Sequence, residues 1–153
     1  IDVEFVVEAF PLGTGGAIKL AAQEVKSSKF VVLNGDTYLG MNFNDFFNAS
    51  AGADLFISAV EVEEASRYGT LILSEDYAVL EMKEKGVVGK SVINSGTYVV
   101  SKSDILNFPM TAFSFEADLI SGFKGRFLAY VNNDYFIDIG IPEDYYKACE
   151  YLQ

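Results

Sequence analysis

The segment Val31–Asp36, with the sequence VVLNGD, constrains the fold of this chain more than any other. It begins with three apolar residues and ends in a turn signal followed by the carboxylate of Asp36. A short apolar run bounded in this way is typical of a buried strand. In open α/β sheets, ligands bind just outside the carboxyl ends of the strands. We therefore expect a buried strand over 29–34 that delivers Asp36 to a ligand.

The neighbouring segments predict a mixed α/β fold. The first third of the chain alternates strand-like and helix-like patterns, as a parallel sheet requires, and the middle reads as antiparallel hairpins. We expect one domain over residues 1–153, with a short helix that Asn44 caps, an amphipathic helix at its end and a Gly/Pro-rich loop over 10–16. The predicted strands are 3–8, 29–34, 54–62, 68–73, 78–83, 92–100, 126–131 and 135–139, and the predicted helices are 17–26, 45–51, 103–106, 115–120 and 143–152.

Composition excludes several classes of function. The chain carries 11 Lys and Arg against 22 Asp and Glu, a net charge of −11, which argues against a nucleic-acid surface. It has no His, so Ser-His-Asp and Cys-His catalysis are excluded, and its single Cys149 argues against disulfides and zinc. No 18-residue window is free of charge and no secretory signal is recognisable, so we expect no membrane association and a cytoplasmic location. The remaining chemistry is that of carboxylates, Lys, backbone donors and a hard metal ion.

Three glycines, Gly13, Gly15 and Gly16, precede the predicted helix at 17–26. Glycines let a backbone approach a ligand closely, and the N–H groups at a helix N-terminus suit anions or a polar base edge. The segment is neither a Walker A motif nor a GxGxxG motif. Taken alone, it fits a plain Gly-rich helix start better than a ligand site.

Two carboxylates, Asp36 and Asp138, each stand at the end of an apolar strand-like run and within two residues of a glycine. Two carboxylates together with substrate phosphates are a usual way for a protein to hold Mg²⁺. The alternative is that both residues cap turns. Because two acids occur at such strand ends, we give the metal-site and the turn-capping interpretations about equal weight.

Further candidates follow the predicted hairpins. Lys85 suits a phosphate as a point charge, and Glu84 beside it could accept sugar hydroxyls, although such a charged run is usually a solvated turn. Asn94 lies in an apolar strand and needs hydrogen-bonding partners, which a ligand hydroxyl or a local bulge could supply. Gly69 fits a turn or a close approach of the backbone to a ligand.

Seven ordered segments resemble the sugar-1-phosphate nucleotidyltransferases, and the resemblance spans the whole chain. The first and last segments are most similar to the D-glycero-α-D-manno-heptose 1-phosphate guanylyltransferase branch, and mannose-1-phosphate guanylyltransferases are close to it. The matching segments are PLGTGGA (11–17), LNGD (33–36), RYGT (67–70), the pair at 84–85, INSGTYV (93–99), SFEADL (114–119) and YFIDIGIPEDYYKA (135–148).

The resemblance implies a Rossmann-like α/β sheet with a nucleotide half and a sugar half. It implies that Asp36 and Asp138 hold Mg²⁺ and that these two residues and Lys85 carry catalysis. The implied nucleotide-binding residues are Gly13, Gly15, Gly16, Gly35 and Asp36, and the implied sugar-binding residues are Gly69, Glu84, Lys85 and Asn94.

The implied activity is nucleotidyl transfer from a nucleoside triphosphate, with GTP favoured, to a heptose or mannose 1-phosphate. The products would be an NDP-sugar for bacterial polysaccharide and pyrophosphate, and a homo-oligomer is expected. The chain departs from the family in one respect. Members of the family begin with a Gly-rich loop that carries an Arg and is followed by Pro-Lys, and this loop is absent from the given sequence. We expect either that the chain is a fragment or that the protein is a catalytically inactive sugar-nucleotide-binding or regulatory relative. An unrelated α/β domain is the third alternative.

Overall fold

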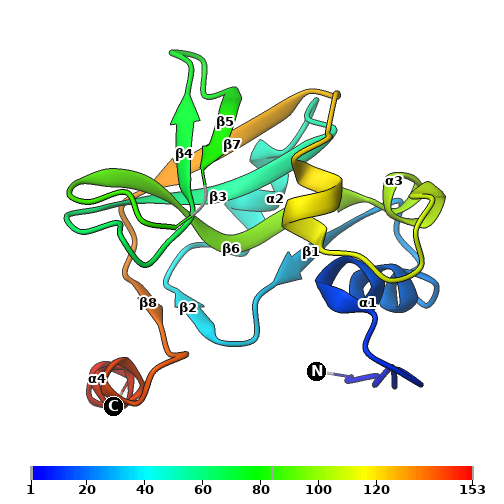
Figure 1. Ribbon diagram of the computed structural model, residues 1–153, viewed down its shortest axis with the longest axis horizontal. Helices are drawn as coiled ribbons and strands as arrows, with labels where there is room; N and C mark the ends of the chain where they lie inside the picture. The colour runs from blue at the N-terminus through cyan, green and yellow to red at the C-terminus, as the bar shows by residue number, and fades with distance from the viewer. Residues whose placement is uncertain (1, 84, 153) are drawn as a thin grey trace. The chain divides into compact units, whose positions relative to one another are not determined.

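A computed structural model describes residues 2–83 and 85–152 (Figure 1). The contacts between Cα atoms divide the chain into two compact units. The first unit comprises residues 1–30 and 100–125, and the second comprises residues 31–99 and 126–153. Among the described helices, none combines the length and the apolar character needed to cross a membrane.

The first unit is helical and is built around Phe113. Its elements are α1 (Gly13–Ala22), α3 (Lys102–Asn107) and the π-helix η1 (Phe115–Ile120). The ring of Phe113 is buried and lies 4.4 Å from that of Phe108 between centroids. The Lys19 ammonium of α1 donates to the Phe108 carbonyl at 2.5 Å, and the Thr14 hydroxyl accepts from the amide of Phe115 at 2.9 Å. These contacts fix α1 against the segment before η1.

The second unit contains most of a mixed sheet. Its strand order is β5-β4-β6-β3-β7, and β1 also pairs with β6. The pair β3·β7 is parallel, and β4 runs antiparallel to both β5 and β6. The strands are β1 (Lys29–Leu33), β3 (Leu55–Val62), β4 (Thr70–Leu73), β5 (Val79–Lys83), β6 (Ser91–Ser101) and β7 (Phe127–Asn132). The predicted mixed α/β sheet is therefore confirmed.

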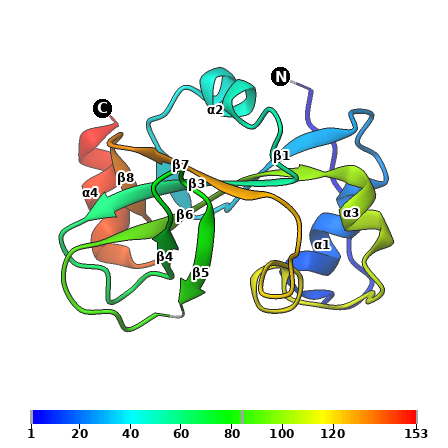
Figure 2. The same ribbon diagram turned by 90° about the horizontal axis from the view of Figure 1, so that it is seen from above.

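The helix α2 (Phe43–Ala49) covers one side of this sheet (Figure 2). Its Phe46 is fully buried, with its ring 5.2 Å from that of Phe56 on β3 and 5.8 Å from that of Tyr130 on β7. Ile93 of β6 belongs to the same buried cluster. Burying an aromatic side chain of this kind contributes about 1.5–3 kcal/mol, so Phe46 ties the helix firmly to the strands.

A second, two-stranded sheet contains Asp138 and begins one residue after Asp36. It pairs β2 (Thr37–Leu39) antiparallel with β8 (Phe136–Asp138), and Thr37 is in register with Asp138. The helix α4 (Pro142–Tyr151) follows β8 directly (Figure 1), and Pro142 stands in its first turn as the sequence predicts.

Several predicted elements need correction. Residues 2–8 form no strand, and Val3, Phe5 and Val7 are exposed, because no described strand pairs with this segment. The helix predicted at 17–26 begins at Gly13 and ends at Ala22, so the glycines lie within its first turn rather than in a loop. Asn42, not Asn44, caps α2, since its side chain accepts from the amides at 44 and 45.

The opening strand is also less buried than the sequence predicts. Strand β1 forms over the expected residues, but they are at most half-buried, and Leu33 is 55% exposed. Among the described strands β1 pairs with β6 alone, so one of its edges has no neighbour. Burial therefore depends on strand order, which an apolar run does not reveal.

Candidate functional site

The carboxylates of Asp36 and Asp138 converge on Gly140. A Cβ atom placed on Gly140 would lie 2.9 Å from Asp138 Oδ1 and 3.5 Å from Asp36 Oδ2. The backbone holds this arrangement, because the amide of Ile139 donates to the Asp36 carbonyl at 2.8 Å. The amide of Gly140 donates to Asp138 Oδ1, also at 2.8 Å. The two acids predicted to act together are thus brought together by the pairing of β2 with β8.

This arrangement suits a magnesium ion. The two side chains supply hard oxygen donors that both lie within 3.5 Å of a Cβ position on Gly140. Within the described part of the chain, no group of three or more His, Cys, Asp or Glu is placed to hold a metal. Two carboxylates are enough for Mg²⁺, which usually keeps several waters and completes its shell with substrate phosphates. The Mg²⁺ assignment itself stays a prediction.

The predicted sugar-binding residues Gly69 and Asn94 are neighbours. The amide of Asn94 donates to the carbonyl of Gly69 at 2.9 Å. The side-chain amide nitrogen of Asn94 donates to the Tyr98 hydroxyl at 2.7 Å, and its side-chain oxygen accepts from the Gly96 amide at 2.8 Å. The polar groups of this half-buried side chain are therefore already used within β6, and a sugar contact there stays a prediction.

Gly96 lies within β6 and contacts Asn34, two residues before Asp36. Its φ is +73°, and a Cβ atom there would lie only 2.5 Å from Asn34 Nδ2. The amide of Asn34 donates to the Gly96 carbonyl at 2.9 Å. Only glycine allows both this backbone conformation and the close approach of Asn34. Gly96 thus lets β6 contact Asn34, two residues before Asp36, while the bulge considered for the 93–96 segment stays a prediction.

We expect Gly96→Ala to lower the free energy of unfolding by about 1–3 kcal/mol, because the new methyl group overlaps Asn34. Urea unfolding followed by circular dichroism measures the loss. Gly89→Ala is the matched control, since its φ is +90° but no atom lies within 4 Å of a Cβ there. Equal losses in the two variants would contradict a role for the Asn34 contact.

An ion pair between Arg67 and Asp144, which the sequence does not predict, lies near Asp138. Arg67 Nη1 lies 2.6 Å from Asp144 Oδ2, and Lys147 Nζ lies 3.1 Å from Asp144 Oδ1. These hydrogen bonds, that of Arg67 first, lower the pKa of Asp144. Burial raises the pKa of Tyr68, and the charge of Asp138 raises it further. Arg67 and Asp144 both lie in segments that resemble the family, RYGT and PEDYY. No spacing rule predicts that two residues so far apart in the sequence form an ion pair.

The positions of the remaining predicted site residues in the second unit do not test their predicted roles. Lys85 and Gly35 are exposed, and no atom lies within 4 Å of a Cβ built on Gly35. The amide of Gly86, next to Lys85, donates to the Ser66 carbonyl at 2.9 Å. Glu84 lies outside the described residues. The assigned roles of these residues stay predictions.

The three glycines of α1 have a structural explanation. A Cβ on Gly15 would lie 2.2 Å from the Phe113 ring, and one on Gly16 would lie 2.5 Å from the carbonyl oxygen of Thr111. The amides of Gly15 and Gly16 both donate to the Phe113 carbonyl, at 2.9 and 3.4 Å. Gly13, with φ +74°, approaches the same carbonyl. The glycines therefore allow close packing within the first unit, and a nucleotide contact by them stays a prediction.

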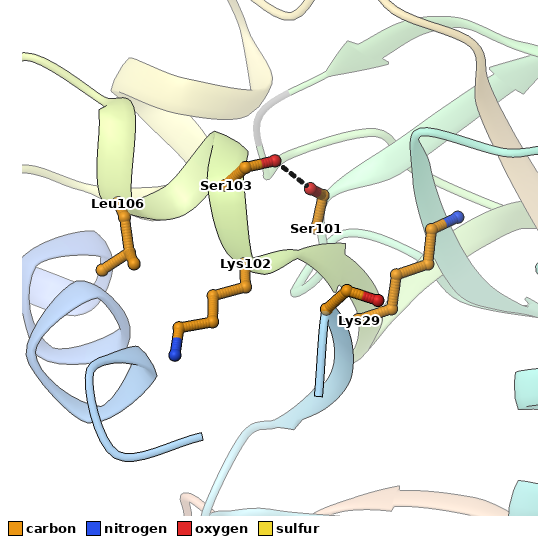
Figure 3. Close-up of a pocket in the computed structure, with 6 residues that line it drawn as sticks. Lys29, Ser101, Lys102, Ser103 and Leu106 are labelled. Carbon is orange, nitrogen blue, oxygen red and sulfur yellow. Dashed lines mark hydrogen bonds between the residues drawn. The ribbon is translucent and has the colours of Figure 1, made fainter. Parts of the chain in front are cut away.

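A cavity of about 420 Å³ lies in the first unit (Figure 3). None of the predicted site residues lines it. The Lys102 ammonium donates to the Val25 carbonyl at 2.6 Å, and the hydroxyls of Ser101 and Ser103 are hydrogen-bonded to each other at 2.8 Å. Since these polar groups have partners within the protein, we do not assign the cavity to the predicted chemistry. Its lining residues are Ser28, Lys29, Ser101, Lys102, Ser103 and Leu106.

Comparisons with known proteins agree with the resemblance seen in the sequence. The family model described as nucleotidyl transferase matches residues 1–153. The chain is 37% identical over 158 residues to a D-glycero-alpha-D-manno-heptose 1-phosphate guanylyltransferase of Aneurinibacillus thermoaerophilus, covering 100% of this chain and 68% of the relative. It is 32% identical to a mannose-1-phosphate guanyltransferase of Candida albicans, covering 99% of this chain and 45% of the relative.

A crystal structure of HddC from Yersinia pseudotuberculosis, complexed with GMP-PN, is also similar. It is 51% identical, with a TM-score of 0.91, over 98% of this chain and 67% of that structure. The chain thus spans about two thirds of the length of the Aneurinibacillus relative and of the HddC structure, and under half of the Candida relative. The predicted family and the predicted fold class are confirmed.

Proposed function

This chain belongs to the nucleotidyl transferase family, and on that premise we propose that its full-length protein transfers a nucleotidyl group to a sugar 1-phosphate. The donor is a nucleoside triphosphate, with GTP favoured, and the acceptor is of the heptose or mannose type. The convergence of Asp36 and Asp138 on Gly140 carries the proposal. The guanylyltransferase relatives and the GMP-PN complex of HddC support the choice of guanine.

The reaction is an in-line displacement. A phosphate oxygen of the sugar 1-phosphate forms a bond to the α-phosphorus of the triphosphate. The bond from that phosphorus to the oxygen bridging to the β-phosphate breaks, and pyrophosphate leaves with the electron pair. No protein nucleophile is needed, so the lack of His is no obstacle. The protein contributes positioning and charge neutralisation.

Different residues of this chain would provide the positioning and the charge neutralisation. Asp36 and Asp138 would hold Mg²⁺, which when bound neutralises phosphate charge and orients the reacting groups. Lys85 would add a positive charge for the sugar phosphate, and Gly69 with Asn94 would lie along the sugar. The hydrogen bond that the Gly140 amide donates to Asp138 Oδ1 keeps that carboxylate directed toward Gly140. We place the activity in the cytoplasm, in nucleotide-sugar supply for bacterial polysaccharide, with a homo-oligomer as a further proposal.

The test is product formation by the full-length protein. We expect an NDP-sugar and pyrophosphate from GTP and heptose or mannose 1-phosphate with Mg²⁺, less product with UTP, dTTP or CTP, and none after EDTA. Chromatography of the nucleotides and a coupled pyrophosphate assay measure both products. A protein that is stabilised thermally by GDP-mannose but yields no product with any donor would instead be the inactive, sugar-nucleotide-binding relative.

A further inference from the structure

The segment Ala65–Gly69, here called the hub segment, contacts three parts of the second unit that carry predicted site residues. The Gly69 carbonyl accepts from the Asn94 amide at 2.9 Å, and the Ser66 carbonyl accepts from the Gly86 amide at 2.9 Å. Through these two bonds the hub segment is joined to the strand that carries Asn94 and to the turn that follows Lys85.

Two side chains join the hub segment to the chain around Asp138. The Tyr68 ring packs edge-on against the Phe136 ring of β8, with centroids 5.4 Å apart. Arg67 forms its 2.6 Å ion pair with Asp144 of α4. Phe136 and Asp144 stand on either side of Asp138 in the sequence, so both contacts act on the short stretch that holds this acid.

The ion pair between Arg67 and Asp144 is partly buried and well bonded, unlike an ordinary surface ion pair. The Asp144 side chain is only 11% exposed, and both of its oxygens are bonded, one to Arg67 and the other to Lys147. The Arg67 guanidinium also lies 5.6 Å from the centre of the Tyr68 ring, where a cation is attracted to the aromatic face. Asp144 therefore holds Arg67, and Arg67 in turn orders the ring that contacts β8.

We propose that Arg67 and Asp144 are positioning residues that hold the sugar-contacting Gly69 and the acid Asp138 in one geometry. This inference rests on the proposed function, because it assumes that Gly69 and Asp138 take part in the same nucleotidyl transfer. Neither residue needs to touch the substrate. Without the ion pair, only the packing of Tyr68 on Phe136 would join the hub segment to the β8–α4 segment, and the acceptor phosphate would be misaligned with the acid.

The test uses Arg67→Gln and Asp144→Asn in the full-length protein. We expect each variant to lose about tenfold to a hundredfold in kcat/KM for the sugar 1-phosphate, because small misplacements at a reacting centre are costly. Both kcat and the apparent affinity for Mg²⁺ should fall, while KM for GTP changes less than twofold. The double variant should lose no more than either single variant, since both remove the same contact.

Two further variants separate positioning from general stability. Arg67→Lys keeps a cation within reach of Asp144 and should restore part of kcat. Lys90→Gln removes an exposed ion pair with Glu61, whose N–O distance is 2.7 Å, and should leave kinetics unchanged. Wild-type kinetics in Arg67→Gln, or losses that simply add in the double variant, would overturn the proposal.

Failure of the proposed function gives a different result. A wild-type protein without turnover would overturn that function but would leave the ion pair open to test by amide hydrogen exchange. In Arg67→Gln, amides of the hub segment and of residues 136–144 should then lose protection together. Loss confined to the hub segment would overturn the proposal independently of any activity.

Discussion

Replacing Asp138 by Asn is expected to reduce nucleotidyl transfer on the order of 10²–10³-fold, the usual cost of removing one electrostatic group from a reacting centre. The change removes the negative charge but keeps an oxygen in place. That oxygen can still accept from the amide of Gly140, as Asp138 Oδ1 does at 2.8 Å. The β2–β8 pairing should therefore survive, and the loss should reside in kcat and in the Mg²⁺ requirement.

Steady-state rates of pyrophosphate release at several Mg²⁺ concentrations measure this effect. Asp104→Asn provides the control, because Asp104 is an exposed acid in the first turn of α3 and is not assigned to the site. Circular dichroism and thermal unfolding should show no change of fold in either variant. Retained turnover in Asp138→Asn would remove this residue from the metal site.

The second large effect is expected for Gly140→Ala, with a loss of about tenfold to a hundredfold in kcat. The added methyl group would lie 2.9 Å from Asp138 Oδ1 and 3.5 Å from Asp36 Oδ2. The first distance is too short for an unstrained contact, so the Asp138 carboxylate must turn away. The backbone of Gly140 does not have the positive φ that favours glycine, so the cost should fall on the site rather than on folding.

Kinetics and Mg²⁺ titration distinguish this result from general destabilisation. Gly40→Ala is the matched control. Gly40 lies after β2, its amide bonds to the Tyr135 carbonyl, and a Cβ there would meet its nearest atom at an ordinary 3.6 Å. We expect Gly40→Ala to behave as wild type. If Gly140→Ala kept full activity with an unchanged Mg²⁺ requirement, the space between the two carboxylates would have no role.

Hydrophobic periodicity allowed most of the strands and helices to be predicted, because this signal is local. The long strand β3 and the helix α4 with its first-turn Pro142 lie close to their expected positions. The three-residue strand β2 was missed, since its pattern is too short and it is held by its pairing with β8. The strand expected over 3–8 was wrong for the related reason that a strand depends on a neighbour as well as on its own pattern.

The glycines show why residue type alone does not establish a site. For Gly15 and Gly16 the pattern alone favoured a plain helix start and the family resemblance implied a nucleotide contact, and in the first unit they allow α1 to pack against Phe113 and Thr111. Gly96 and Gly140 were not selected, yet they leave the space that Asn34 and the two carboxylates occupy. A glycine acts through what approaches it, and that neighbour is known only once the chain is folded.

By itself, the sequence determined that this chain is a mixed α/β protein with Asp36 and Asp138 at the ends of strand-like runs. It also excluded His-dependent chemistry, because composition and local apolar patterns are properties of the chain alone. Only the tertiary structure decided that the two acids meet at Gly140 and that Arg67 reaches Asp144. Those contacts join residues far apart in sequence, and the pairing of β2 with β8 and the packing of Tyr68 on Phe136 bring them together.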